Sequence, residues 1–576
     1  MNDYRRRRKI NRWLYKLNVL AENKKLSPIE KIKTTSDGLR GTLQESLQDE
    51  VTGAIREDDQ ALIKFHGMYQ QDDRDRREER TEKKLEWLYS YMIRLRLPGG
   101  LMKADQWVGL NHIAGDYSTG VIKVTTRQTI QLHGIVKSKI KPTISAFNTL
   151  HLDSIAACGD VNRNVVCSAH PSQSALHEEI FSYAERISIM ALPKTRSYYE
   201  IWLNEESLTA DRKKDEADPL YQDRYLPRKF KIAIAIPPDN DVDVFANDIG
   251  MIAIAENGKL AGFNIAAGGG LSTTHGNTAT YARLASMLGY VSGDENIMKV
   301  VYEIITIQRD FGNRSDRKLA RLKYTIDTMG VDAFKTELEK RCGFALEPAR
   351  PYTFTKREDH FGWQQNYAGN WYYTVFTENG LIKDMDSCAL KTGLLEIAKT
   401  GKSDFRFTCN QNLVLSDIKS SDKKFIESLL ESTGIGRHTE QASLIRRNAI
   451  ACVAFNTCPL ALAEAQRYLP SLITKIEPLL SKYAIDKEEL HLRMTGCPNG
   501  CGRPYVAEIG LIGTAYGKYN LHIGGDRFGE RLNTKYKDNL DEEAILAELE
   551  SLFERFSAQK EPGEGFGDFV TRKKMV

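Results

Sequence analysis

Four of the nine cysteines in the chain are spaced as a set that could hold a metal cluster. Cys452 and Cys458 form a C-x5-C pair, and Cys497 and Cys501 form a C-x3-C pair 38 residues further on. Four converging thiolates can enclose an iron–sulfur cage. The second pair lies in GCPNGCG, whose glycines and Asn499 suit this role because small residues let backbone N–H groups approach the sulfurs. We therefore expect these cysteines to hold one cluster.

Two other interpretations fit the same residues. Structural zinc sites favour C-x2-C or C-x4-C knuckles, which neither pair matches, although a distorted four-cysteine zinc site is compatible with the sequence. Buried, inert thiols are the usual alternative, but proline and glycine around these four are uncommon for packing residues. The other five cysteines are scattered: Cys158, Cys167, Cys342, Cys388 and Cys409.

The net charge of +4 hides an uneven distribution, since residues 1–34 contain eleven basic and three acidic residues. Such a block is usually a solvated arm, although a nucleic-acid contact, a membrane-surface contact or a targeting extension would also use it. No apolar run reaches the roughly 18 residues of a transmembrane helix. No apolar h-region follows the basic start, and cysteines are sparse, which favours a cytoplasmic protein with reduced thiols.

Apolar runs of strand length alternate with helical patterns, which is typical of a mixed α and β chain. The charged residues 69–91 are predicted to form a solvated helix or a wrapping arm. The runs of strand length are residues 93–97, 121–132, 232–236 and 249–254, and the clearest helical patterns are residues 296–308 and 541–556.

An internal repeat about 280 residues apart gives the organisation of the chain. IKVTTRQTIQLHGI (122–135) aligns with FRFTCNQNLVLSDI (405–418), and DIGMI (248–252) aligns with EIGLI (508–512). Two further pairs keep the same order: GGLMK (99–103) with NGLIK (379–383), and RNVVC (163–167) with RNAIAC (447–452) after one inserted residue. The order predicts a duplicated unit with a pseudo-two-fold axis and a large ligand between its halves.

The motifs TCPLALAEAQRYLP and TGCPNGCGRP resemble those of the nitrite and sulfite reductase family. The resemblance runs from about Leu39 to the end of the chain. FHGMYQQDDRDRREER (65–80) and YLPRKFK (225–231) are similar to the assimilatory, NADPH-dependent branch. The resemblance implies that Cys452, Cys458, Cys497 and Cys501 ligate a 4Fe-4S cluster, and that Cys501 is also the axial ligand of a sirohaem iron.

The resemblance also implies an α+β, three-domain fold with duplicated ferredoxin-like and sirohaem/iron–sulfur units. The expected boundaries are an arm and wrapping segment over 1–80, ferredoxin-like halves over 81–150 and 351–430, a first reductase domain over 151–350 and a second over 431–576.

The implied reaction is the six-electron reduction of sulfite to sulfide in assimilatory sulfur metabolism and cysteine biosynthesis. Reducing a compact oxyanion needs fixed cations, arginine as a permanent fork and lysine as a proton donor with a tunable pKa. Arg94, Arg163, Lys229 and Lys231 match the anion-binding set of the family, and the two lysines would share one face of a strand. Taken singly, each would more often be a solvated surface charge. Nitrite reduction is the alternative within the family.

Sirohaem carries many carboxylates, so its pocket needs further cations and N–H donors. The candidates are Thr126, Arg127 and Gln128 on the first repeat, Arg228, Asn499, and the cluster Arg314, Arg317, Arg321 and Lys323. Asn410 replaces Arg127 in the second repeat. Gly268, Gly269 and Gly270 would allow close backbone approach to the macrocycle or form a plain turn.

Three histidines, His66, His133 and His170, are expected to be structural, since the protein ligand of the iron is expected to be Cys501. Some relatives join a cysteine to a tyrosine in this region, and the residues here would be Cys158 and Tyr69.

No G-x-G-x-x-G follows a strand and opens a helix, so no nicotinamide or flavin domain is expected in the chain. Electrons must come from another protein. The resemblance implies a flavoprotein (alpha) subunit that oxidises NADPH within a hetero-oligomer, and ferredoxin is the alternative donor.

Overall fold

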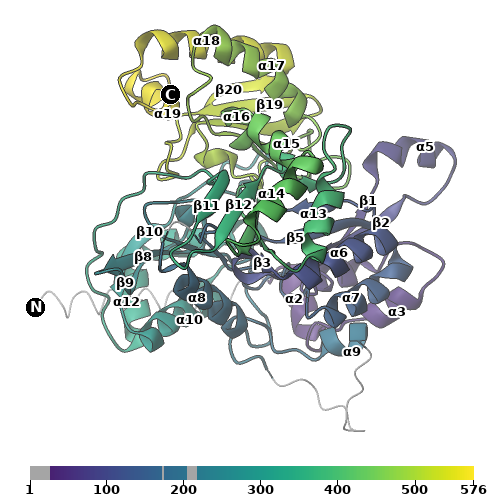
Figure 1. Cartoon of the computed structure of the whole chain (residues 1–576). Helices are drawn as coiled ribbons and strands as arrows, with labels where there is room; N and C mark the ends of the chain where they lie inside the picture. The colour runs from purple at the N-terminus through teal and green to yellow at the C-terminus, as the bar shows by residue number, and fades with distance from the viewer. Residues whose placement is uncertain (1–25, 172–173, 204–216) are drawn as a thin grey trace, which may run out of the picture.

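The computed structural model describes residues 26–171, 174–203 and 217–576, and Figure 1 shows its course. Residues 1–25, which carry most of the basic arm, lie outside the described residues, so the structure does not bear on the arm's role. In the described part, no helix combines the length and the hydropathy needed to cross a membrane.

Four five-stranded sheets form two similar pairs. The first sheet has the order β1-β2-β5-β4-β13 and is antiparallel throughout. Its strands are β1 (Met68–Asp72), β2 (Tyr89–Arg94), β4 (Ile122–Val124), β5 (Ile130–Ile135) and β13 (Leu381–Ile382). The matching sheet has the order β11-β12-β15-β14-β3, with β3 (Leu101–Met102), β11 (Gly362–Gln365), β12 (Trp371–Val375), β14 (Asp404–Phe407) and β15 (Leu413–Ile418).

Each of these sheets takes its edge strand from the other half. Met102 of β3 pairs with Phe405 of β14, and Leu381 of β13 pairs with Lys123 of β4. These exchanged strands carry the repeated GGLMK and NGLIK sequences. The repeat is therefore a pair of interlocked units that share one buried core.

The other two sheets have parallel strands followed by antiparallel ones. In β6-β7-β8-β9-β10 the first three are parallel, and all four residues of β7 are buried, as expected for a strand covered on both faces. Its strands are β6 (Val166–Cys167), β7 (Ile232–Ala235), β8 (Ile249–Glu256), β9 (Lys259–Ala267) and β10 (Ser286–Val291). The C-terminal sheet contains β16 (Ile450–Ala451), β17 (Leu492–Thr495), β18 (Ile509–Ala515), β19 (Lys518–Ile523) and β20 (Thr534–Leu540).

Helices cover these sheets, and their amphipathic patterns explain why (Figure 1). In α10 (Asp294–Phe311) the buried residues recur at helical spacing, from Ile297 through Val300, Val301 and Ile304. The two helical patterns predicted from the sequence are α10 and α18 (Glu542–Gln559), each slightly longer than expected. The remaining helices of the two reductase units are α8 (His177–Met190), α9 (Ser197–Leu203), α11 (Leu322–Met329), α12 (Val331–Cys342), α16 (Leu444–Arg447), α17 (Leu469–Lys482) and α19 (Phe566–Arg572).

Helices also flank the ferredoxin-like sheets, where α6 (Ala104–Tyr117) packs on α13 (Leu390–Lys399). The others there are α7 (Ile140–Thr149), α14 (Lys423–Ser432) and α15 (Ile435–Gln441). The N-terminal segment adds α2 (Pro28–Thr35), α3 (Leu43–Gln48), α4 (Glu57–Leu62) and α5 (Arg77–Glu82).

Strand pairing fixes which residues are equivalent in the two halves. Val166 pairs with Ala233 in the first half, and Ile450 pairs with Arg493 in the second. This register matches RNVVCS to RNAIAC without a gap, so the one-residue insertion inferred from the sequence is wrong. Ser168, not Cys167, occupies the position of Cys452, because each directly follows its short strand.

The predicted strand over residues 121–132 is a hairpin. β4 ends at Val124 and β5 begins at Ile130, and between them Gln128 adopts a left-handed conformation with φ 51°. The equivalent Gln411 does the same with φ 70°. This turn is what brings Thr126 and Arg127 to the interface of the halves.

Candidate functional site

The four clustered cysteines converge at the carboxyl ends of β16 and β17. The Gly496 N–H donates to the Cys452 sulfur at 3.3 Å, and the Asn499 amide approaches the Cys497 sulfur at 3.6 Å. Burial, together with the neighbouring Cys501, raises the pKa of Cys452 and raises that of Cys497 to about 11. Without a metal these thiols therefore stay protonated, and a bound cluster would have to displace their protons.

The geometry of these sulfurs bears on the zinc interpretation. No three His, Cys, Asp or Glu side chains of the described residues are arranged around a single-ion position. The pKa shifts of Cys452 and Cys497 indicate that the four sulfurs lie close enough to interact. Gly496 lets the two cysteine segments approach, since a Cβ there would lie 2.4 Å from the carbonyl oxygen of Ala463.

A cation-lined recess adjoins Cys501, the most exposed of the four cysteines. Thr126 Oγ1 donates to the Cys501 carbonyl at 3.1 Å and so ties the first-repeat turn to the cysteine loop. The recess is lined by Thr126, Arg127, Lys229, Lys231, Val242, Ala246, Asn247, Leu271, Ser272, Arg321, Asn499, Gly500 and Arg503.

Two cations that line the recess, Lys229 and Lys231, and the neighbouring Arg228 have no partner in the described part of the chain. Within the described part of the chain, Arg228, Lys229 and Lys231 make no side-chain hydrogen bond or ion pair. Burial, reinforced by Arg228, lowers the pKa of Lys229 to about 7, and burial beside Arg127 lowers that of Lys231 well below its ordinary value. Half-buried cations without a partner are costly, so the recess suits a bound anion.

Two arginines provide donors for the same polyanion. The Nε atoms of Arg127 and Arg503 are buried and lack an acceptor within the described chain. Arg127 is held in place because its Nη1 donates to Asn247 Oδ1 at 2.9 Å and its Nη2 donates to the Asn164 and Ile232 carbonyls. Both residues therefore fit a cofactor rich in carboxylates.

The predicted arginine cluster divides between the recess and the scaffold. Arg321 lines the recess and is fixed by Asp248, with Nη2 to Oδ2 at 2.7 Å. Arg317 instead pairs with Asp160 at 2.6 Å. Lys323 donates to the Gly270, Ser272 and Tyr281 carbonyls, so it holds a loop and has no spare donor for a cofactor. Arg314 pairs with Glu30 of α2, outside the recess.

Gln128 does not reach the recess. Its Nε2 donates to the Cys167 carbonyl at 2.7 Å, and its Oε1 accepts from the Cys167 N–H at 3.0 Å. Gln411 likewise accepts from the Ala451 N–H. The two glutamines clamp equivalent short strands, so Gln128 positions the turn that carries Arg127.

The first-half glycines serve packing between chain segments. A Cβ on Gly269 would lie 2.1 Å from the Phe245 carbonyl oxygen, and one on Gly268 would meet Ile326 at 2.7 Å. At Gly270 it would lie 3.1 Å from the Arg321 guanidinium. At Gly269 the close approach is between backbone segments of the protein.

Arg94 and Arg163 form a second group of cations around Cys158. Arg94 Nη1 lies 3.1 Å from the Cys158 sulfur, and Arg163 Nε donates to the Gly159 carbonyl at 2.7 Å. Arg163 also donates to the Tyr69 hydroxyl. Tyr69 and Cys158 thus lie in one buried group. Arg163 and Lys229 are close enough to interact, which places this group next to the recess.

Comparison with known proteins decides the family. Two family profiles match: "Nitrite and sulphite reductase 4Fe-4S domain" over residues 182–346 and "Nitrite/Sulfite reductase ferredoxin-like half domain" over 88–149 and 364–432. A "Sulfite reductase [NADPH] hemoprotein beta-component" of Leptospira biflexa is 62% identical over 96% of this chain and 99% of that protein. The chain belongs to the nitrite and sulfite reductase family.

Further relatives agree with this assignment. The beta-components of Anoxybacillus flavithermus and Myxococcus xanthus are each 50% identical, over 96% and 95% of this chain and 96% and 97% of their own lengths. The solved structure of Mycobacterium tuberculosis NirA protein shares the fold, with a TM-score of 0.77 at 23% identity over 96% of this chain and 98% of NirA. The α+β fold with duplicated units predicted from the sequence is confirmed.

In the first half of the duplicated unit, other residues occupy the positions of Cys452 and Cys501. Asp241 occupies the position of Cys501, since each is the sixth residue after the aligned strands β7 and β17. Asp241 accepts from Ser168 Oγ and from the Ala169 N–H, both at 2.8 Å. In the first half, a hydrogen-bonded Ser–Asp pair therefore stands where the second half has Cys452 and Cys501.

Two residues at the cysteine site escaped the sequence prediction. Arg74, in the segment expected to be solvated, donates to the Cys458 and Ala461 carbonyls at 2.9 and 2.8 Å. Asp73 accepts from the Asn456 amide at 2.8 Å. The segment thus braces a cysteine loop, although the rest of it, including α5, is mostly exposed. Asp73 and Arg74 lie in the sequence DDRDR, whose high charge led to the prediction of a solvated segment.

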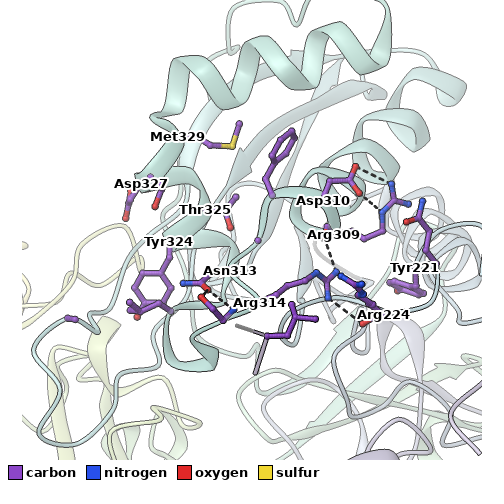
Figure 2. A pocket seen from close by; sticks show the side chains of 18 of the residues that line it. Tyr221, Arg224, Arg309, Asp310, Asn313, Arg314, Tyr324, Thr325, Asp327 and Met329 are labelled. Atoms are coloured by element: carbon purple, nitrogen blue, oxygen red, sulfur yellow. Dashed lines mark hydrogen bonds and ion pairs between the residues drawn. The ribbon is translucent and has the colours of Figure 1, made fainter. Parts of the chain in front are cut away.

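A separate cavity of about 820 Å³ in the first reductase unit does not carry this chemistry (Figure 2). Two of its arginines are engaged: Arg309 pairs with Asp310 at 2.7 Å, and Arg314 Nη2 donates to the Tyr225 carbonyl at 2.7 Å. The third, Arg224, is exposed. This cavity contains none of the four clustered cysteines.

The three histidines are all hydrogen-bonded inside the protein. His66 lies between the Leu39 carbonyl and the Trp202 indole N–H, at 3.0 and 2.8 Å. His133 contacts Gln71 and Gln131, and His170 contacts Asp359. None is among the residues that line the recess.

Acid is expected to destabilise the protein through His66. Burial lowers its pKa to about 4, against about 6.5 in the unfolded chain, so the unfolded state binds the extra proton. The free energy of unfolding should therefore fall by about 3 kcal/mol as the pH drops from 6.5 to 4. Urea unfolding midpoints of wild type and His66→Gln at pH 7 and 4.5 measure this. The exposed His112→Gln is the control, and an equal loss in all three proteins would contradict it.

Proposed function

We propose that this chain is the haemoprotein component of an assimilatory sulfite reductase, which reduces sulfite to sulfide with six electrons. The observation that carries the proposal is the recess of unpaired cations next to Cys501. The names of the relatives favour sulfite as the substrate. When bound, sirohaem supplies an iron to which sulfite coordinates, and a 4Fe-4S cluster delivers electrons to it.

The four clustered cysteines have two roles in this proposal, ligation of the cluster and ligation of the sirohaem iron. Cys452, Cys458, Cys497 and Cys501 would hold the cluster. Cys501 would also be shared with the sirohaem iron, because it is the exposed one of the four and directly follows Gly500, which lines the recess. Asn499 and the Gly496 N–H stabilise the charge on the sulfurs.

The recess cations bind the carboxylates of the macrocycle. Arg127, Arg228 and Arg321 provide the charge, and Thr126 borders the same space. Asp248 and Asn247 orient Arg321 and Arg127 before the cofactor arrives. Such preorganisation lowers the cost of ordering side chains on binding.

Sulfite itself meets the remaining cations. Arg94 and Arg163 hold the oxyanion as permanent charges, while Lys229 and Lys231 donate protons to the departing oxygens. The pKa of Lys229, near 7 without an anion, rises toward the charged form when an anion lies beside it. Lys229 is therefore able both to bind the anion and to release a proton near neutral pH.

We infer that electrons come from a flavoprotein (alpha) subunit that oxidises NADPH, because relatives 62% and 50% identical to this chain are named as beta-components. A ferredoxin donor is the alternative. The cytoplasm, where sulfide feeds cysteine biosynthesis, is the compartment we propose.

An absorption spectrum and steady-state kinetics test the function. The purified protein should show isobacteriochlorin bands, iron and acid-labile sulfide, and reduced methyl viologen should support sulfite reduction. A colourless protein fully loaded with zinc would refute the cofactors. A much larger kcat/KM for nitrite than for sulfite would instead assign the chain to nitrite reduction.

A further inference from the structure

Arg503 lines the cofactor recess from the second half, two residues after Cys501. It is 8% exposed and its Nε has no acceptor within the described chain. Its Nη2 donates to the Cys409 carbonyl at 2.5 Å, and its Nη1 lies 3.0 Å from Asp243 Oδ2. Both terminal nitrogens of the guanidinium are therefore fixed, and its buried Nε is left without an acceptor.

Asp243 is the structural counterpart of Arg503 in the first half. Each immediately precedes an equivalent short 3-10 helix, Val244–Ala246 or Pro504–Val506, and each is left-handed, with φ 48° and 59°. Their ion pair joins equivalent positions across the pseudo-two-fold axis. An acid and a base at these two positions can pair only because the duplicated halves have diverged.

Two further buried arginines hold Asp243. Arg357 Nε and Arg493 Nη1 lie 2.7 and 2.6 Å from its two oxygens. Although burial alone would raise it, Arg357, Arg493 and Arg503 hold the pKa of Asp243 well below its ordinary value. One carboxylate thus faces three guanidinium groups, and positive charge stays in excess beneath the recess.

The linker between the repeats, residues 356–360, fills the counterpart of the recess. The Asn410 amide, at the position of Arg127, donates to the Arg357 carbonyl at 3.1 Å. His491, at the position of Lys231, pairs with Glu358 at 3.3 Å. The Asn240 N–H, at the position of Gly500, donates to the Lys356 carbonyl at 2.8 Å. The linker therefore contacts the counterparts of Arg127 and Lys231, two residues that in the recess keep donors without a protein partner.

We propose that Arg503 is a further cofactor-binding residue that donates to a carboxylate of the macrocycle, and that Asp243 and Arg357 are positioning residues for it. This inference rests on the proposed function, because it takes the recess to hold sirohaem. The linker fixes Arg357, Arg357 fixes Asp243, and Asp243 aims Arg503. In this way the linker, which occupies the counterpart of the recess, helps to position Arg503 in the recess itself.

Binding of sirohaem to apo-protein is the decisive measurement. Arg503→Gln should weaken the affinity about 10- to 100-fold, as expected for a lost charged hydrogen bond, and Arg503→Lys should recover part of it. Glutamine and lysine must both adopt the left-handed backbone conformation of Arg503, so a difference in affinity between the two variants reports the charged donor and not backbone strain. Arg446→Gln is the matched control, because Arg446 pairs with Glu378 and Glu477 in the same half but does not line the recess.

Asp243→Asn separates positioning from general stability. It should lower sirohaem affinity while the acid-labile sulfide per folded chain, which only the cluster contributes, stays at the wild-type level. An equal fall in cluster content and sirohaem would overturn the positioning role. Wild-type affinity in both Arg503 variants, with wild type reducing sulfite, would overturn the binding role and leave the proposed function intact. A wild-type protein that binds no sirohaem would overturn the proposed function and this inference together.

Discussion

Cys501→Ser is expected to abolish sulfite reduction and to remove both prosthetic groups from the purified protein. Cys501 is exposed at the border of the recess, and its carbonyl accepts from Thr126 of the other half. A serine hydroxyl is a much harder and less acidic ligand than a thiol, so it binds iron of a cluster poorly. Losing the shared ligand would also remove the link between the two redox groups. The absorption spectrum, iron content and methyl viologen-linked activity measure these losses.

Cys388→Ser is the matched control for this substitution. Cys388 is a buried thiol outside the four-cysteine set, and burial raises its pKa to about 11, so it stays protonated. That variant should keep its colour, its iron and its activity. Retention of wild-type colour and activity by Cys501→Ser would refute the shared-ligand role.

Lys229→Met is expected to lower kcat for sulfite by about 10²–10⁴-fold, the range for loss of a general acid. Lys229 faces the recess without a protein partner, and its lowered pKa suits proton donation near neutral pH. Methionine keeps much of the side-chain length but can neither carry charge nor donate. Because the charged form prevails below the pKa of the free enzyme, which kcat/KM reports, wild-type kcat/KM for sulfite should fall as the pH rises above 7. Steady-state rates from pH 6 to 9 test both statements.

Lys229→Arg separates charge from proton transfer. Arginine keeps the positive charge but stays protonated throughout this pH range, so it binds the anion without releasing a proton. The variant should keep KM for sulfite near the wild-type value and lose kcat. Equal kcat in Lys229→Arg and wild type would exclude Lys229 as the proton donor.

Sequence reasoning succeeded where chemistry depends on residues that are local in the chain. The spacing of the four cysteines and the order of the repeated segments led to the family and to the duplicated fold, both confirmed. Helical periodicity located α10 and α18 because one face of each is buried along its length. The roles of the individual site residues stay proposals.

The same reasoning failed to separate recess cations from scaffold cations. Arg317, Arg321 and Lys323 are close in sequence, yet only Arg321 reaches the recess, because the short helices there turn their side chains in different directions. Gln128 and Gln411 are identical for a structural reason, because each side chain hydrogen-bonds to the backbone of a neighbouring short strand. Residue type and spacing do not encode which of several equal charges already has a partner.

The sequence by itself determined the thiolate set, the duplication and the family, because each depends on residue identity at fixed separations along the chain. Only the tertiary structure decided which cations are left unpaired, that Asp241 stands where the other half has Cys501, and that Arg503 meets Asp243. These facts depend on contacts between residues far apart in the chain, such as Ser168 with Asp241 and Arg503 with Asp243, and such contacts form only when the chain folds.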